Sequence, residues 1–114
     1  MIGIDLEKVD RFKNFNQQEL NRIFTTNEID YANSYNEPES HLAGIWATKE
    51  AFIKAVKNKA IPLKDIEILH DENHAPYINI TPRLESFIMD KNYSSVDVSI
   101  SHTKDDVVSV VQIL

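Results

Sequence analysis

Three short stretches of the sequence combine residue types that can do chemistry. Asp5 interrupts an apolar alternation near the start of the chain, Glu50 and Lys54 are four residues apart, and Ser99-Ile100-Ser101-His102-Thr103 combines an imidazole with three hydroxyls. Two carboxylates from different elements are a suitable partial ligand set for Mg²⁺, which usually completes its coordination with water and substrate phosphate. Lysine and histidine beside them would neutralise phosphate oxygens. Together the stretches predict phosphoryl-type transfer, in which positioning and charge stabilisation carry most of the catalysis.

Each stretch also has a simpler interpretation. Asp5 alone is typical of a strand-edge charge or a cap. Glu50 and Lys54 lie on one helix face, where an ordinary surface ion pair contributes about 0.2–0.5 kcal/mol. Residues 99–103 alone would be a solvated strand face that ends in a turn. The chemical hypothesis therefore requires the three stretches to meet in the fold.

Two other arrangements are weaker. His70 and His74 have the spacing of a helical metal pair, but the surrounding pattern is strand and turn, so we interpret them as surface histidines. A hydrolytic triad of Ser101, His102 and either Asp5 or Asp97 is conceivable. However, neighbours on a strand point to opposite sides, and the glycines of a nucleophile elbow are missing. Acyl hydrolysis is therefore not expected.

Length and composition limit the class of protein. The 114 residues fit a single domain that covers the whole chain and can bury one core. A net charge of −6 argues against nucleic acid or an anionic membrane as the main partner. We expect no membrane span, because no run of about 18 apolar residues occurs. The absence of cysteine excludes a disulfide framework and a thiol nucleophile, and with no visible secretory signal it predicts a cytoplasmic protein.

Apolar periodicity predicts the elements that position these residues. Alternation predicts five strands, at residues 1–9, 65–70, 77–80, 95–101 and 107–114, of which the second and third form one hairpin and the last two another. Helical spacing predicts four helices, at about residues 16–24, 25–31, 39–57 and 81–91. Three helix starts carry N-cap residues: Asn16, Thr25 in a Thr-x-x-Glu capping box, and Thr81 before Pro82. The fold class is therefore α+β, with a mostly antiparallel sheet packed on a long central helix.

Six motifs follow one another along nearly the whole chain. They are Gly3-Ile4-Asp5-Leu6 with Arg11 following; Phe24-Thr25-Thr26-Asn27-Glu28; Leu42-Ala43-Gly44 leading into Ala47-Thr48-Lys49-Glu50-Ala51-Phe52-Ile53-Lys54-Ala55; Asp65-Ile66-Glu67-Ile68; Pro76-Tyr77-Ile78; and Val98-Ser99-Ile100-Ser101-His102-Thr103. Their order and spacing resemble the holo-acyl-carrier-protein synthases, the small phosphopantetheinyl transferases. The blocks at residues 42–55 and 98–103 are the most specific.

The resemblance implies a Mg²⁺-dependent enzyme of fatty-acid biosynthesis. It would transfer 4′-phosphopantetheine from coenzyme A to a serine of apo acyl carrier protein and release adenosine 3′,5′-bisphosphate. By this resemblance Asp5 and Glu50 hold the metal, and Lys54 is a further catalytic residue that contacts phosphate. Glu50 would also act as base for the serine hydroxyl, directly or through a metal-bound water. Further coenzyme A contacts are implied for His102, Ser101, Thr103 and Pro76. Similar proteins are trimers with sites between subunits, so a homotrimer is expected.

The acidic chain carries a local basic segment. From Lys8 to Arg22 it has four basic residues and two acidic ones, a local charge of +2. Acyl carrier proteins are acidic as a family, and a positive patch would raise the rate of association. The resemblance implies docking here, at Arg11, Lys13 and Arg22.

The sequence departs from the family pattern at three places. Ile45 follows Gly44 where the family typically has an arginine that helps to anchor a coenzyme A phosphate, residues 56–60 replace a longer glycine-containing loop, and His74-Ala75-Pro76 replaces Gly-Lys-Pro. These losses leave a second hypothesis open, a non-catalytic family descendant that binds carrier protein or scaffolds an assembly. The retained metal and phosphate residues favour the enzyme.

Overall fold

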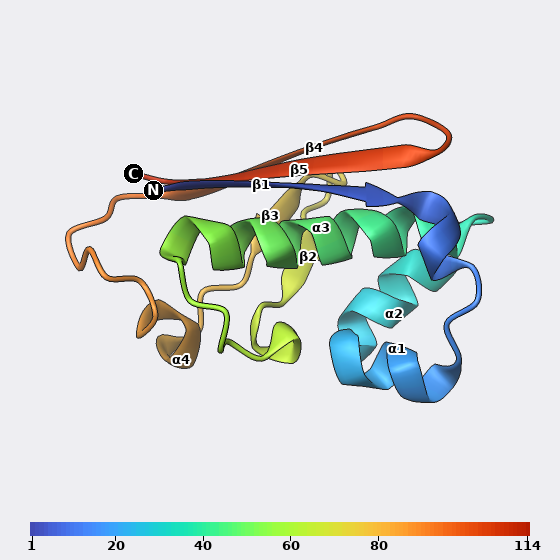
Figure 1. The fold of residues 1–114 in the computed structure, drawn as a ribbon, viewed down its shortest axis with the longest axis horizontal. Coiled ribbons are helices and arrows are strands. Elements are labelled where there is room, and N and C mark those ends of the chain that lie inside the picture. Colours follow the sequence, from blue (N-terminus) through green and yellow to red (C-terminus); the bar gives the residue numbers. More distant parts are fainter.

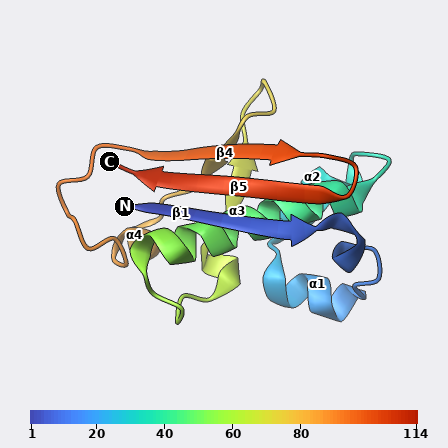
Figure 2. The ribbon, with the colours of Figure 1, turned by 45° about the horizontal axis from the view of Figure 1, so that its top comes forward.

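A three-stranded sheet and a long helix form the two main layers. In the computed structural model, which describes residues 1–114, the antiparallel sheet contains β1 (Ile2–Lys8), β4 (Val96–His102) and β5 (Asp106–Ile113) in the order β1-β5-β4. Helix α3 (Pro38–Val56) lies along one face of this sheet (Figure 1). Because β1 pairs with β5, the two chain ends lie close together at one end of the sheet (Figure 2). The α+β class and the long central helix are therefore confirmed.

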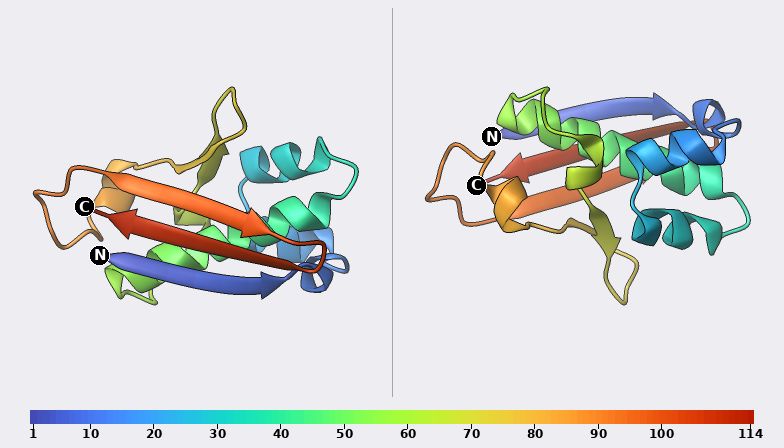
Figure 3. Two further views of the ribbon diagram at one scale, coloured as in Figure 1. Left: turned by 90° about the horizontal axis from the view of Figure 1, so that it is seen from above. Right: turned by 90° about the horizontal axis from the view of Figure 1, so that it is seen from below.

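The remaining elements are shorter, and α1, α2 and α4 lie on the side of α3 away from the large sheet (Figure 1). They are η1 (Val9–Phe12), α1 (Gln17–Ile23), α2 (Thr26–Asn33), η2 (Leu63–Asp65), β2 (Ile68–His70), β3 (Pro76–Ile78) and α4 (Pro82–Glu85). Strands β2 and β3 pair as a separate antiparallel hairpin, which extends from the body of the molecule (Figure 3). None of the helices combines the length and the apolar character that a membrane crossing requires.

Local capping explains where the short helices begin. The Asn16 side chain accepts a hydrogen bond from the Glu19 amide at 2.8 Å, and Glu19 accepts one from the Asn16 amide at 3.3 Å. Thr25 and Glu28 form the same reciprocal arrangement at the start of α2. Each capping box satisfies two amides that the first helical turn leaves without partners. The predicted N-caps are confirmed.

Two predicted elements are shorter than expected. Helix α4 ends at Glu85: the Ser86 amide still donates to the Pro82 carbonyl oxygen, but the Phe87 and Ile88 amides donate to the third preceding residue. Ile88 is still buried like Leu84, but Met89 is 79% exposed and no α-helical hydrogen bonds continue beyond Ser86. Strand β2 begins at Ile68 because the preceding residues form η2, so the predicted strand start at Asp65 is wrong.

The side of β1 that faces α3 is polar and small, whereas its apolar residues face outward. Gly3 and Asp5 are buried against the helix. A Cβ atom at Gly3 would overlap the carbonyl oxygen of Ala51 and lie 2.7 Å from the Ala55 amide nitrogen, so only glycine permits this close approach. The predicted strand is thus confirmed, but its alternation does not place the isoleucines in the core of the monomer.

The outward apolar residues form one continuous surface, which we call the outer sheet face. Ile2, Ile4 and Leu6 are 65%, 57% and 67% exposed. On β5, Val110 is the register partner of Ile4 and Val108 that of Leu6. An exposed apolar patch of this kind is typical of a protein interface.

The end of α3 stores backbone strain at one lysine. Lys57 has φ 58° and ψ 41°, a left-handed conformation that costs about 1–2 kcal/mol for a residue with a side chain, whereas glycine gives up about 0.5–1 kcal/mol of chain entropy. We therefore expect Lys57→Gly to raise the free energy of unfolding by about 0.5–1 kcal/mol. Urea titration would measure it. Lys59→Gly, where φ is not positive, is the matched control and should give no gain.

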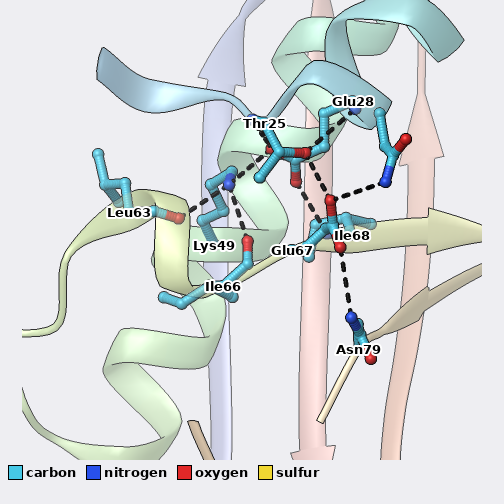
Figure 4. A network of polar contacts seen from close by, with 9 residues as sticks. Thr25, Glu28, Lys49, Leu63, Ile66, Glu67, Ile68 and Asn79 are labelled. Carbon is cyan, nitrogen blue, oxygen red and sulfur yellow. Dashed lines mark hydrogen bonds and ion pairs between the residues drawn. The ribbon is translucent and has the colours of Figure 1, made fainter. Parts of the chain in front are cut away.

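A buried polar network connects α2, α3 and the β2–β3 hairpin (Figure 4). Lys49 and Glu28 form an ion pair of 2.8 Å with both side chains fully buried. The ammonium also donates to the carbonyl oxygens of Leu63 at 2.8 Å and Ile66 at 2.7 Å. The carboxylate accepts from the amides of Thr25 and Ile68, each at 2.8 Å. Lys49, which belongs to the motif at residues 42–55, therefore has a structural role.

Candidate active site

Strand β1 and helix α3 bring Asp5 and Lys54 into direct contact. Lys54 Nζ lies 3.0 Å from Asp5 Oδ1 and donates to the Ile4 carbonyl oxygen at 2.9 Å. Asp5 is buried, while the Lys54 side chain is half exposed. Glu50, one helical turn earlier on α3, makes no ion pair, so the simple interpretation of Glu50 and Lys54 as a surface pair is wrong. Lys54 instead forms its ion pair with Asp5.

The negative charges near this contact interact with one another. The pKa of Glu50 is raised, first by burial and then by the charge of Asp5. Burial also raises the pKa of Glu7 to about 7, with a further increase from its contact with Asp5. Arg11 partly offsets this through an ion pair with Glu7 at 2.9 Å. Asp5 is therefore the centre of a small acidic group.

Glu7 is a site residue that sequence reasoning missed. It is two residues after Asp5 on a strand, and this spacing places both side chains on the same face of the sheet. The alternating spacing of Asp5 and Glu7 was therefore visible in the sequence, but the packing of this strand face against α3 was not.

The acidic group fits a hard cation that arrives with a substrate. No set of three or more histidine, cysteine, aspartate or glutamate side chains is arranged to enclose a metal ion. However, Asp5 Oδ2 is buried without a hydrogen-bond partner, and burial followed by repulsion from Asp5 raises the pKa of Glu50. Mg²⁺ commonly binds through one or two carboxylates, with water and substrate phosphate as the other ligands. The chemistry of Asp5 and Glu50 suits that mode of binding.

At the end of β4, the side chains of residues 101–103 lie in different environments. Glu7, Val107 and His102 are partners across the sheet, so His102 faces the same side as the acidic residues. Ser101 belongs to the next row and faces outward. Thr103 accepts hydrogen bonds from the amides of Asp105 and Asp106 in the turn. Because Ser101 and His102 point to opposite sides, the structure agrees with the exclusion of a hydrolytic triad.

Pro76 and His102 line one cleft of about 250 Å³ together with His41, His70 and His74. The ring of His70 is stacked on Tyr31 at 3.6 Å, and its Nδ1 atom is buried. The interpretation of His70 as a surface histidine is therefore wrong, whereas His74 is exposed.

The three basic residues assigned to docking differ in their environments. Arg11 pairs with Glu7, and its guanidinium lies 4.6 Å from the centre of the Trp46 ring. Lys13 pairs with Asp10 at 2.9 Å. Arg22 is exposed on α1 and makes no ion pair. Arg22 thus carries the least compensated charge of the three.

The fold and the acidic site define a class of transferase. The model of the 4′-phosphopantetheinyl transferase superfamily matches residues 1–111. The chain belongs to this superfamily and, within it, to the holo-[acyl-carrier-protein] synthases. It is 34% identical over 113 residues to the holo-[acyl-carrier-protein] synthase of Thermoanaerobacter sp. (strain X514), covering 95% of this chain and 82% of the relative.

Two further proteins support this assignment. The holo-[acyl-carrier-protein] synthase of Protochlamydia amoebophila is 38% identical over 108 residues, which cover 89% of this chain and 86% of that one. The crystal structure of the Helicobacter pylori holo-[acyl-carrier-protein] synthase in complex with coenzyme A matches with a TM-score of 0.84 and 30% identity over 100% of both chains. Membership of an enzyme family favours the transferase over the non-catalytic scaffold.

Proposed function

We propose that this protein transfers 4′-phosphopantetheine from coenzyme A to a serine of an apo acyl carrier protein, as a single domain of the cytoplasm and in fatty-acid biosynthesis. The observation that carries the proposal is the contact between β1 and α3, which gathers Asp5, Glu50 and Lys54 on the side of the sheet that His102 also faces. The similar Helicobacter pylori synthase forms a complex with coenzyme A, which supports the choice of donor.

The chain's own residues divide the work of the transfer. Glu50 accepts the proton of the carrier serine, a role for which its raised pKa is suited. The serine oxygen then bonds to the β-phosphorus of coenzyme A, the bond from that phosphorus to the bridging oxygen breaks, and adenosine 3′,5′-bisphosphate leaves. Lys54 and His102 contact phosphate oxygens and stabilise the developing charge. Ser101, Thr103 and Pro76 are proposed as further coenzyme A contacts.

Asp5 and Glu50 are the residues proposed to hold Mg²⁺. The unpartnered Oδ2 atom of Asp5 and the repulsion between these carboxylates support this assignment. When bound, the ion would polarise the phosphate under attack and neutralise charge on the leaving group.

The decisive experiment is a transfer assay read by intact mass. The protein is incubated with apo carrier protein, coenzyme A and Mg²⁺, and the expected result is a carrier that gains one phosphopantetheine. The folded protein, checked by circular dichroism, should be tested with several carriers. If no carrier gains mass under these conditions, the proposed function is wrong and the scaffold hypothesis gains support.

We also propose a homotrimer with active sites between subunits. The outer sheet face supports it, because Ile2, Ile4 and Leu6 would otherwise remain in water. A groove beside Leu6 is lined by Ser101, His102 and Thr103, so a second copy seated on this face would lie next to these proposed coenzyme A contacts.

A charged residue on the outer sheet face should dissociate the assembly. We expect Leu6→Glu to convert the protein to monomers in sedimentation velocity and to abolish most transferase activity, while circular dichroism remains that of a folded chain because Leu6 is exposed in the monomer. Tyr77→Glu, at a 45% exposed residue on the separate hairpin, is the matched control and should change neither property. An unchanged sedimentation coefficient for Leu6→Glu would contradict this interface.

The carrier is proposed to dock on the basic segment. Arg22 supplies free charge there, and Arg11 and Lys13 lie in the same segment but share their charge with Glu7 and Asp10. A local positive patch on an acidic enzyme would increase the association rate with an acidic carrier.

A further inference from the structure

All four histidines of the chain meet at one place, which we call the histidine cleft. They come from different elements, with His41 on α3, His70 on β2, His74 in the β2–β3 turn and His102 at the end of β4. A smaller pocket of about 110 Å³ adjoins the cleft and shares three of the histidines. Residues that are far apart in the sequence are therefore combined in one concave surface.

Aromatic contacts hold the imidazole rings in place. His70 stacks on Tyr31 with ring centres 3.6 Å apart, and His41 stacks on Tyr35 at 3.8 Å. The hydroxyls of the two tyrosines are 3.0 Å apart, and the Tyr35 hydroxyl lies 3.1 Å from His74 Nδ1. The cleft is therefore built before any ligand arrives.

The walls of the cleft carry no fixed charge. Neither the cleft nor the adjoining pocket is lined by lysine, arginine, aspartate or glutamate. Ile45, the residue that stands where the family typically has an arginine, lines the adjoining pocket and is 1% exposed. Any positive charge in this surface must come from protonated imidazole.

The neighbouring charges act on the histidines in known directions. Burial lowers the pKa of His70 to about 4, and repulsion from His41 and His74 adds to this effect, while Asp71 acts in the opposite direction. Burial and His102 lower the pKa of His41. His102 also borders a groove on the outer side of the sheet, where Asp106 is the acidic residue, and Glu7 lies in the same row of the sheet as His102. In the free protein His41 and His70 are thus mainly neutral near pH 7.

An anion bound in the cleft would favour the protonated form of these histidines over the neutral form. A negative charge within a few ångströms stabilises the protonated imidazole, so binding the anion and binding protons favour each other. A metal ion is a poorer occupant, because the histidines are not arranged to enclose one. Phosphate on a ligand with a flat base suits both the chargeable imidazoles and the aromatic walls.

We propose that His41, His70 and His74, together with His102, bind a phosphate group of coenzyme A with uptake of protons, in place of a permanently charged side chain. This inference rests on the proposed function and adds its regulation by pH. Coenzyme A should therefore bind more tightly as the pH falls from about 8 to about 6.

Isothermal titration calorimetry of the full chain tests the proposal. Coenzyme A is titrated at about pH 6 and about pH 8, in two buffers with different ionisation enthalpies. We expect about tenfold tighter binding at the lower pH and an uptake of about one proton, which appears as a buffer-dependent heat. A parallel titration with 3′-dephospho-coenzyme A shows whether the 3′-phosphate or the pyrophosphate is the group that binds.

Substitution of the histidines shows whether the pH dependence of binding comes from them or from Glu7, whose pKa is raised to about 7. His41→Gln with His74→Gln should reduce the ratio of the two dissociation constants to near one. Asn73→Gln, an exposed change in the same turn, is the matched control and should keep the ratio of the unmodified protein. Ile45→Arg supplies a fixed charge and should tighten binding at about pH 8 if circular dichroism shows it folded.

The outcomes distinguish this inference from the function on which it rests. If coenzyme A binds equally at both pH values, or if the double histidine variant keeps the full pH dependence, the inference is overturned while the proposed transferase stands. If coenzyme A fails to bind at either pH, the proposed function is itself contradicted.

Discussion

Replacement of Glu50 by glutamine should reduce the turnover number by about 100- to 10,000-fold, the range that a general base contributes. The amide cannot accept the serine proton, and it is a weaker ligand for Mg²⁺ than a carboxylate. Because both roles act on the chemical step, we expect a large loss in kcat and a small change in the KM for the carrier. The measurement is the initial rate of carrier mass gain at saturating coenzyme A.

This loss should occur in a folded protein. Glu50 is only partly buried and makes no ion pair, so its substitution leaves no partner uncompensated. Burial and, after it, the charge of Asp5 raise the pKa of Glu50, so a neutral amide removes both the burial of a charge and a repulsion. Glu72→Gln, at an exposed glutamate in the β2–β3 turn, is the control and should keep full activity. Activity of Glu50→Gln within a few-fold of the unmodified protein would contradict both the base and the metal assignments.

Features determined by neighbouring residues were predictable from the sequence. Asn16 and Thr25 cap their helices through side chains only three residues away, and α3 has the apolar spacing of a helix buried on several sides. The two hairpins also follow from short-range signals, since a turn separates each pair of strands. For such elements, the local free-energy preference and the tertiary fold agree.

The orientation of β1 could not be predicted in this way. Alternation shows that Ile2, Ile4 and Leu6 share a face, but it does not reveal which face meets the helix. The close approach of Gly3 to Ala51 decides this, and it places Asp5 beside Lys54. Local patterns therefore indicated the candidate catalytic residues. Only the packing of β1 on α3 shows that Asp5 and Lys54 are in contact.

The buried ion pair between Glu28 and Lys49 could not be predicted from the sequence for a different reason. Glu28 is explained locally by a capping box, and Lys49 by its place in a motif, so neither signalled a partner 21 residues away. The histidine cleft is a similar case, because its four members lie on separate elements. Residues with a sufficient local explanation can still carry a second, tertiary role.

Substitution of Lys49 by methionine should destabilise the protein by about 3–5 kcal/mol, because removing one partner of a buried ion pair leaves the other charge without compensation. Glu28 would remain fully buried, with only the Thr25 and Ile68 amides to stabilise its charge. The carbonyl oxygens of Leu63 and Ile66 would lose their common donor. Urea unfolding followed by circular dichroism measures the loss. The matched control is Lys13→Met, which breaks an exposed pair and should leave the unfolding midpoint unchanged.

The pH dependence of this variant gives a second test. Burial already raises the pKa of Glu28 with Lys49 present, and removal of the ammonium would raise it further. A carboxyl whose folded pKa lies above its unfolded pKa contributes stability at low pH and loses it as the pH rises through the folded value. The deficit of Lys49→Met should therefore be smaller near pH 5 than near pH 8, and addition of Glu28→Gln, which removes the charge, should flatten this dependence. An equal deficit at both pH values would show that lost packing, and not the unpaired carboxylate, destabilises the variant.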